Sequence, residues 1–184
     1  MTQPRVLIAC IGNIFLGDDA FGVEVARRMA SSRLPEGVVL KDFGIRGLDL
    51  TYALLDPYEV IILVDACSRG GTPGTLYLLE PDPLELGTSD STLAALDAHS
   101  MNPMAVLRSV RSMGGAMGGG ATSRIFIVGC EPAELGLDEG GRIGLSDVVR
   151  DAVDEALNMI ESLIATALNT SLNKESTEGT LQLQ

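Results

Sequence analysis

Short apolar runs alternate with amphipathic segments along most of this chain, and that alternation restricts the folds open to it. The run at 58–66 (YEVIILVDA) is nearly continuous in apolar residues, which is typical of a strand buried on both faces of a sheet. The segment from Asp18 to Met29 instead places apolar residues three and four positions apart, the spacing of one helix face. Strands alternating with helices predict a three-layer α/β fold.

One predicted strand breaks the parallel pattern. The predicted strands are 5–11, 37–43, 58–66, 75–80 and 124–129, and the later predicted helices are 47–55, 103–112 and a last one from Ser146. Only the eight residues 67–74 separate the third strand from the fourth, whereas a parallel crossover needs about a dozen or more. The fourth strand is therefore predicted to run antiparallel to its neighbours.

The last residues have a different character from the rest of the chain. The apolar stripe of the last helix ends near residue 168, and residues 169–184 (NTSLNKESTEGTLQLQ) carry no such stripe. We therefore expect a single domain over residues 1–168 and a disordered tail over residues 169–184.

Charge and composition exclude several classes of partner. The chain has 13 Lys and Arg against 25 Asp and Glu, a net charge of −12, and no Trp. Nucleic-acid binding needs a basic surface, so we expect no nucleic-acid partner. The apolar runs are far shorter than the ~18 residues of a membrane span, so we expect no membrane partner. The widely spaced Cys10, Cys67 and Cys130 form no disulfide framework, which favours a reducing, cytoplasmic location.

Acidic residues recur just beyond the predicted strands, where open α/β sheets bind ligands. Asp18 and Asp19 follow the first strand, Asp42 lies at the end of the second and Asp65 at the end of the third. Two carboxylates at a helix N-terminus would repel a phosphate, and the loop before them lacks both GxGxxG and the P-loop lysine. We expect no nucleotide cofactor. Acidic residues also cap helices, and we assign that role to Asp18.

Asp19, Asp65 and His99 form a candidate metal site. Asp65 ends an apolar run, where a carboxylate needs either a neutralising partner or a hydrogen-bonded turn. His99 is the only histidine and lies in a polar stretch, so it is either a ligand or a surface residue without a role. Two oxygens and one nitrogen suit a divalent ion such as Zn²⁺ or Ni²⁺ and leave coordination positions open.

Two other kinds of chemistry have weaker support. The three cysteines fall at or just past strand ends, but they are better explained as small buried apolar residues than as metal ligands. A Ser-His-Asp triad could use the single histidine, but the chain contains no GxSxG motif.

Five segments, in this order and spacing, resemble the hydrogenase maturation proteases, the endopeptidases that finish the large subunit of [NiFe] hydrogenase. The resemblance covers about residues 5–150. Its segments are the opening VLIACIGNIFLGDDAFGVEV, DFGIRG at 42–47, ILVDA at 62–66 with PGT at 73–75, HSMNP at 99–103, and VGCEP at 128–132.

The resemblance implies a fold and a ligand set. The fold is a mixed, mostly parallel, twisted sheet of five strands flanked by helices. The implied metal ligands are Asp19, Asp65 and His99, and many relatives have glutamate at the position of Asp19. The loop DFGI at 42–45 departs from relatives that read Asp-Gly-Gly-Thr, although Asp42 is retained.

The implied reaction is a single cut that removes the C-terminal extension of the [NiFe] hydrogenase large-subunit precursor after nickel insertion. Asp19, Asp65 and His99 would bind nickel that the precursor supplies, and this divalent metal would polarise the scissile carbonyl or activate a water. The candidate catalytic carboxylates are Asp42, Asp19 and Asp65, one of which would act as general base. The alternative is a nickel-sensing chaperone that binds the same precursor without cutting it.

Overall fold

Strands and helices alternate in the computed structural model, which describes residues 6–81, 103, 106–108, 110, 124–136 and 143–181, with side chains as far as residue 170. The elements in chain order are β1 (Val6–Ile11), η1 (Asp18–Ala20), α1 (Phe21–Met29), β2 (Val38–Gly44), α2 (Gly47–Ala53), β3 (Val60–Ala66), β4 (Leu76–Leu79), β5 (Arg124–Cys130) and α4 (Asp147–Leu181). The predicted helix 103–112 lies partly outside the described residues, and those described within it are helical.

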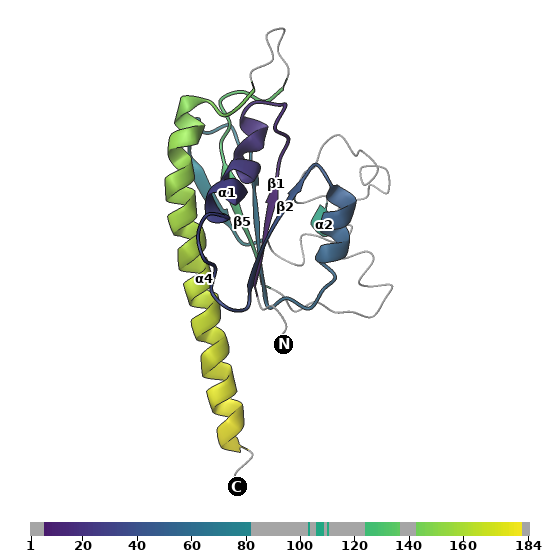
Figure 1. Cartoon of the computed structure of the whole chain (residues 1–184), viewed down its shortest axis with the longest axis vertical. Helices are drawn as coiled ribbons and strands as arrows, with labels where there is room; N and C mark the ends of the chain where they lie inside the picture. Colours follow the sequence, from purple (N-terminus) through teal and green to yellow (C-terminus); the bar gives the residue numbers. More distant parts are fainter. Residues whose placement is uncertain are drawn as a thin grey trace.

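The five strands form one sheet in the order β2-β1-β3-β5-β4 (Figure 1). The pairs β1–β2, β1–β3 and β3–β5 are parallel, and β4 is antiparallel to β5. The predicted mixed sheet and its antiparallel fourth strand are confirmed. The short connection from β3 does not make a hairpin with β4. It passes over the carboxyl end of β5, where the Cys67 N–H donates to the Cys130 carbonyl (2.8 Å) and the Gly74 N–H to the Glu131 carbonyl (2.8 Å).

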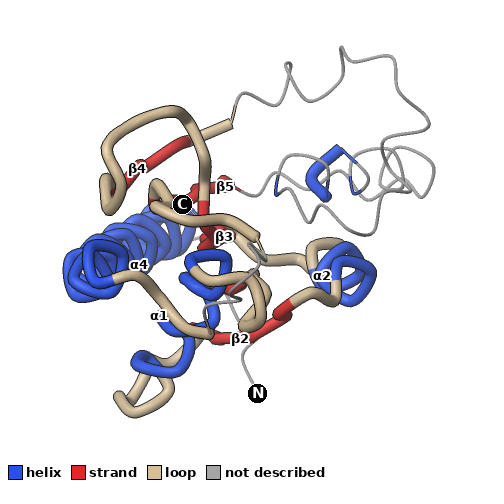
Figure 2. Tube along the Cα trace, turned by 90° about the horizontal axis from the view of Figure 1, so that it is seen from above, coloured by secondary structure: helices blue, strands red, loops and turns tan. Residues whose placement is uncertain are grey.

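Helices cover both faces of the sheet (Figure 2). Helices α1 and α4 pack on one face, and α2 packs on the other together with Val106 and Leu107. Successive side chains of a strand point to opposite faces, so a strand between two helical layers has no position that faces water. All six residues of β1 are buried for this reason, with Val6, Ile8 and Cys10 in one core and the other three in the second.

Helix α1 buries the apolar stripe that its spacing predicts: Phe21, Gly22, Val25, Ala26 and Met29. Gly22 lets the helix lie very close to the sheet. A Cβ there would be 2.2 Å from the Ile11 carbonyl oxygen and 2.4 Å from that of Val64. The start of α1 is therefore held against the carboxyl ends of β1 and β3, which also fixes the position of the residues just before it.

Helix α4 extends beyond its predicted end and runs to Leu181, past the body of the sheet (Figure 1). Residues 169–184 were predicted to be disordered, and the structure differs from that prediction as far as Leu181. Extending a helix adds one hydrogen bond per residue without a new nucleus, and residues 169–178 contain neither Gly nor Pro. A packed apolar stripe is therefore not required. The division into a domain of 1–168 and a separate tail stays a prediction.

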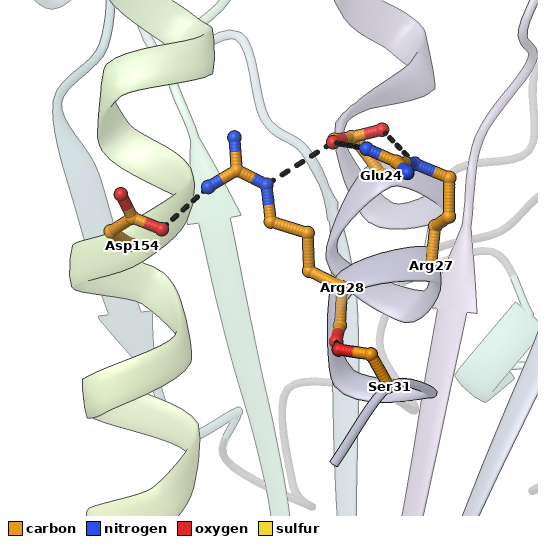
Figure 3. Close-up of polar contacts among 5 residues, drawn as sticks. All are labelled: Glu24, Arg27, Arg28, Ser31 and Asp154. Carbon is orange, nitrogen blue, oxygen red and sulfur yellow. Dashed lines mark hydrogen bonds and ion pairs between the residues drawn. The ribbon is translucent and has the colours of Figure 1, made fainter.

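A group of charged side chains joins α1 to α4 on the solvent side of their contact (Figure 3). Arg28 donates to Glu24 (3.2 Å) on its own helix and to Asp154 (2.5 Å) on α4. Arg27 forms two further hydrogen bonds with Glu24. None of the described helices combines the length and the apolar composition needed to cross a bilayer.

Candidate active site

The parallel strands end at one edge of the sheet, and the predicted aspartates gather there. Cys10, near the end of β1, is paired with Asp42 of β2 on one side and with Val64 of β3 on the other. Asp65 follows Val64 directly, so the ends of β2 and β3 place Asp42 and Asp65 on either side of β1. Asp19 comes from the loop and turn that follow β1.

The loop after β1 folds back on itself and positions Asp19. The Asn13 N–H donates to both the Asp19 carbonyl (3.2 Å) and the Asp19 Oδ2 (3.0 Å). The Gly12 N–H donates to the Gly44 carbonyl (3.1 Å), which ties this loop to the end of β2. A Cβ on Gly12 would lie 2.1 Å from the Asp19 carbonyl oxygen, so only glycine permits this approach. The Gly-Asn pair of the sequence is therefore what sets the position of Asp19.

Asp65 is almost completely buried, with 4% of its surface exposed. Its Oδ1 accepts a hydrogen bond from the Ala66 N–H (2.9 Å). Burial raises the pKa of Asp65 well above its usual range, and the nearby Asp19 carboxylate raises it further, against a lowering contribution from the Ala66 N–H. Burial also raises the pKa of half-buried Asp19, and the Asn13 N–H partly offsets that effect. Two carboxylates of one site thus repel each other, an arrangement that a bound cation would relieve.

Asp42 lies at the same edge but is exposed. Its Oδ1 accepts the Gly44 N–H (2.9 Å), and the Arg46 guanidinium donates to the backbone carbonyls of Asp42 and Phe43. The departure from a glycine-rich loop has a structural reason, because the Phe43 side chain is buried in the core on the α2 face. This anchors the turn and leaves the Asp42 carboxylate accessible.

The buried thiol of Cys10 lies between these carboxylates. Burial raises the pKa of Cys10 strongly, and Asp42 and Asp65 raise it further. Cys10 and Cys130 are both fully buried members of the core under α1 and α4, while Cys67 is half-buried. The interpretation of the cysteines as small buried apolar residues is confirmed for Cys10 and Cys130. A neutral thiol at Cys10 also adds no charge to the site.

The third predicted ligand, His99, lies outside the described residues. The structure brings the other two predicted ligands, Asp19 and Asp65, together. Among the residues that the structure describes, no three His, Cys, Asp or Glu side chains are arranged to hold a metal ion. The three-ligand site and the catalytic roles of Asp19, Asp42 and Asp65 therefore stay predictions.

Asp18 does not cap the helical turn that it begins, contrary to our assignment. It is 1% exposed, and its carboxylate accepts four hydrogen bonds from distant segments. The donors are the N–H groups of Ala133 (2.8 Å), Glu134 (3.1 Å) and Ser146 (2.6 Å) and the Ser146 Oγ–H (2.9 Å). The donors of the β5–α4 connection satisfy the buried carboxylate better than its own turn can. Asp18 therefore fastens the loop after β1 to the start of α4.

Sequence reasoning gave Glu131 no role, although this residue organises the connection between β3 and β4. Glu131 follows β5 and is 3% exposed. Its carboxylate accepts the N–H groups of Arg69 (2.9 Å) and Gly70 (3.1 Å) and the Tyr77 hydroxyl (2.8 Å). Burial alone would raise the pKa of Glu131, but these donors and the Gly71 N–H bring it below its usual value. In the sequence, its two signals were its position directly after an apolar strand and its place in the segment VGCEP at 128–132.

Comparison with known proteins places this fold and site in a family. Residues 23–163 match the family model described as hydrogenase maturation protease. The hydrogenase expression/formation protein HupD of Rhodobacter capsulatus is 35% identical over 156 residues, which cover 83% of this chain and 68% of HupD. The chain belongs to the hydrogenase maturation protease family, whose members are endopeptidases.

Solved structures of this class share the fold. The [NiFe] hydrogenase maturation protease HycI from Thermococcus kodakarensis superposes with a TM-score of 0.62 at 27% identity, over 91% of this chain and 94% of that one. The hydrogenase maturating endopeptidase HybD from E. coli gives a TM-score of 0.69 over 89% and 93%, and at 24% identity it supports the fold alone. The predicted three-layer α/β architecture is confirmed.

Proposed function

We propose that this endopeptidase acts in the cytoplasm, without a nucleotide cofactor, on the large-subunit precursor of a [NiFe] hydrogenase. It removes the C-terminal extension after nickel has been inserted, and Asp19, Asp65 and His99 recognise that nickel. The observation that carries the proposal is the pairing of Asp19 with buried Asp65 at the carboxyl edge of the sheet. Membership of the hydrogenase maturation protease family supports it.

The electrostatics of the pair favour a cation that arrives with the substrate. Asp65 is costly to ionise beside Asp19 in a buried site, so a divalent ion bound there would be the charge that stabilises both carboxylates. Two carboxylates and one imidazole leave coordination positions open, which suits an ion already held by the precursor. A precursor without nickel offers nothing to bind, and this prevents premature cutting.

The peptide bond lies next to the nickel in this proposal. The metal polarises the scissile carbonyl, and a carboxylate removes a proton from the attacking water. Asp42 suits the second role because it is exposed at the same edge and its carboxylate is oriented by the Gly44 N–H. In this scheme Asp19 and Asp65 bind the nickel, and one of them would act as general base only if cleavage continues without Asp42.

Cleavage of defined precursors tests the proposal. Metal-stripped protein is incubated with nickel-loaded precursor, and metal-loaded protein with nickel-free precursor, and mass spectrometry follows the loss of the extension. We expect cutting in the first mixture and an intact chain in the second. Efficient cutting of nickel-free precursor by metal-loaded protein would identify an ordinary metalloprotease. Binding of nickel-loaded precursor without a mass loss would instead identify the nickel-sensing chaperone.

A further inference from the structure

Exposed apolar side chains gather at the same edge of the sheet as the aspartates. Within the described residues, nine large apolar side chains are exposed, and eight of them belong to segments that follow the carboxyl ends of β1, β2 and β5. Five of these, with exposed fractions of 49% to 67%, form what we call the apolar rim: Ile14, Phe15, Ile45, Leu48 and Leu135. Exposed apolar groups that cluster mark interaction sites, whereas scattered ones do not.

Backbone hydrogen bonds place the three segments of the apolar rim next to one another. The Gly12 N–H donates to the Gly44 carbonyl (3.1 Å), which joins the loop after β1 to the turn that carries Ile45. On the other side, Gly17 pairs with Leu135 in an antiparallel bridge. The loop that carries Ile14 and Phe15 is therefore in the middle, with the other two segments flanking it.

The central loop is also well ordered by its own hydrogen bonds. The Phe15 N–H donates to the Asn13 Oδ1 (3.0 Å), the Leu16 N–H to the Asn13 carbonyl (3.1 Å), and the Asp19 N–H to the Leu16 carbonyl (3.2 Å). The Asn13 that organises Phe15 also donates to the Asp19 carboxylate. Phe15 is thus held in a fixed relation to the candidate metal ligand, and its 63% exposure follows from the fold of the loop.

We propose that the apolar rim is a docking surface for an apolar polypeptide segment of the precursor, next to the nickel that Asp19 and Asp65 bind. The inference rests on the proposed function and adds a contact that does not depend on the metal. The rim adjoins the aspartate site through Asn13, which contacts both Phe15 and the Asp19 carboxylate, so a chain that brings a cation to Asp19 and Asp65 comes close to the rim. The net charge of −12 and the adjacent carboxylates disfavour an acidic segment, while apolar side chains gain by burial against the rim.

Two kinds of contact then share recognition of the substrate. The rim binds the polypeptide whether or not nickel is present, and the aspartates add affinity only for the loaded precursor. A few buried anchors near the centre of an interface, often aromatic, carry most of its binding energy, so the aromatic Phe15 of the central loop is expected to matter most.

Serine substitutions on the rim test this inference. Phe15→Ser and Leu135→Ser are compared with the control Leu78→Ser, which removes a side chain of 48% exposure from β4. Biolayer interferometry gives the dissociation constant for nickel-free precursor, and cleavage of nickel-loaded precursor gives KM and kcat. We expect Phe15→Ser to raise both the dissociation constant and KM about tenfold, with kcat within about twofold of the parent. Leu135→Ser should have a smaller effect in the same direction, and Leu78→Ser none.

The outcomes separate this inference from the proposed function. If the parent cuts and both rim variants bind and cut like Leu78→Ser, the rim is not a docking surface although the function stands. If the parent does not cut but Phe15→Ser still weakens binding, the function fails and the rim stands. Sedimentation of the parent as a dimer, with Phe15→Ser as a monomer, would show that a second copy of this chain covers the rim and would overturn the inference. Circular dichroism checks that each variant is folded.

Discussion

Asp18 and Asp65 are both buried at the carboxyl edge of the sheet, with exposures of 1% and 4%, but their surroundings are opposite. Asp18 accepts four hydrogen bonds from the connection between β5 and α4. Among the described residues, Asp65 accepts one, from the Ala66 N–H, and has the Asp19 carboxylate nearby. A buried carboxylate surrounded by donors stabilises the fold, whereas one beside a second carboxylate is available for a cation.

Asp18 and Asp19 extend this contrast to adjacent residues. Consecutive side chains on a helical turn point about 100° to 120° apart, so the turn η1 directs the two carboxylates to different partners. Asp18 reaches the start of α4, and Asp19 accepts the Asn13 N–H beside Asp65. Two adjacent residues therefore have different roles: Asp18 stabilises the fold, and Asp19 belongs to the candidate active site.

The largest effect should come from Asp65→Asn, tested against Asp18→Asn. Removing the charge of Asp65 deletes a proposed nickel ligand, and kcat/KM for nickel-loaded precursor should fall about 100- to 1000-fold, as when a group that stabilises a transition state is lost. Asp18→Asn, assayed well below its melting temperature, should keep most of the activity. Equal losses for the two variants would break the comparison, because Asp18 would then also belong to the catalytic site.

The second-largest effect is on the free energy of unfolding, and here Asp18→Asn should be the more damaging substitution. Asp18→Asn replaces one of the two carboxylate oxygens by an amide NH2 group. Either the Ser146 N–H, which donates to Oδ1, or the N–H groups of Ala133 and Glu134, which donate to Oδ2, then lose their acceptor. Unfolding in urea should show a loss of about 2 kcal/mol, the range for leaving buried donors unsatisfied. Asp19→Asn is the matched control at the next residue, and we expect it to lose far less. If Asp19→Asn proved the more destabilising of the two, Asp19 rather than Asp18 would be the structural residue.

The features that the sequence predicted correctly are those determined by residues close together in the chain. The buried stripe of α1 and the antiparallel direction of β4 follow from local spacing and a short connection, and both are confirmed. The role of Asp18 depends on residues more than 110 positions away, so local reasoning saw only a helix start and assigned a cap. Glu131 was missed for the same reason, because its donors come from the connection between β3 and β4.

A third prediction concerns pH. Because the pKa of Asp65 is raised in the folded protein, the unfolded chain releases this proton first as the pH rises through about 4. Ionisation then favours the unfolded state, so this carboxyl lowers stability progressively above that pH. Asp65→Asn should match the parent near pH 4 and be more stable than the parent by about 1 kcal/mol near pH 7, since asparagine has no proton whose release favours the unfolded state. Urea unfolding at both pH values measures the difference.

A parent more stable than Asp65→Asn at pH 7 would contradict the comparison. It would mean that the Asp65 carboxylate is neutralised within the folded chain, as Asp18 is by its donors. Adding Ni²⁺ at pH 7 gives an internal check, because an ion that binds Asp19 and Asp65 should stabilise the parent more than Asp65→Asn.

The smallest effect should come from the charged side chains between α1 and α4, which pair with one another (Figure 3) but remain exposed to solvent. Arg28 donates to Asp154 (2.5 Å), whose side chain is 75% exposed. Exposed ion pairs are screened by solvent and salt, so Asp154→Asn should lower the free energy of unfolding by less than about 0.5 kcal/mol. The difference should shrink further in 0.5 M salt, an ionic strength of about three times the physiological value. A loss as large as that of Asp18→Asn would show that an aspartate can contribute strongly to stability without being buried, and would contradict the comparison.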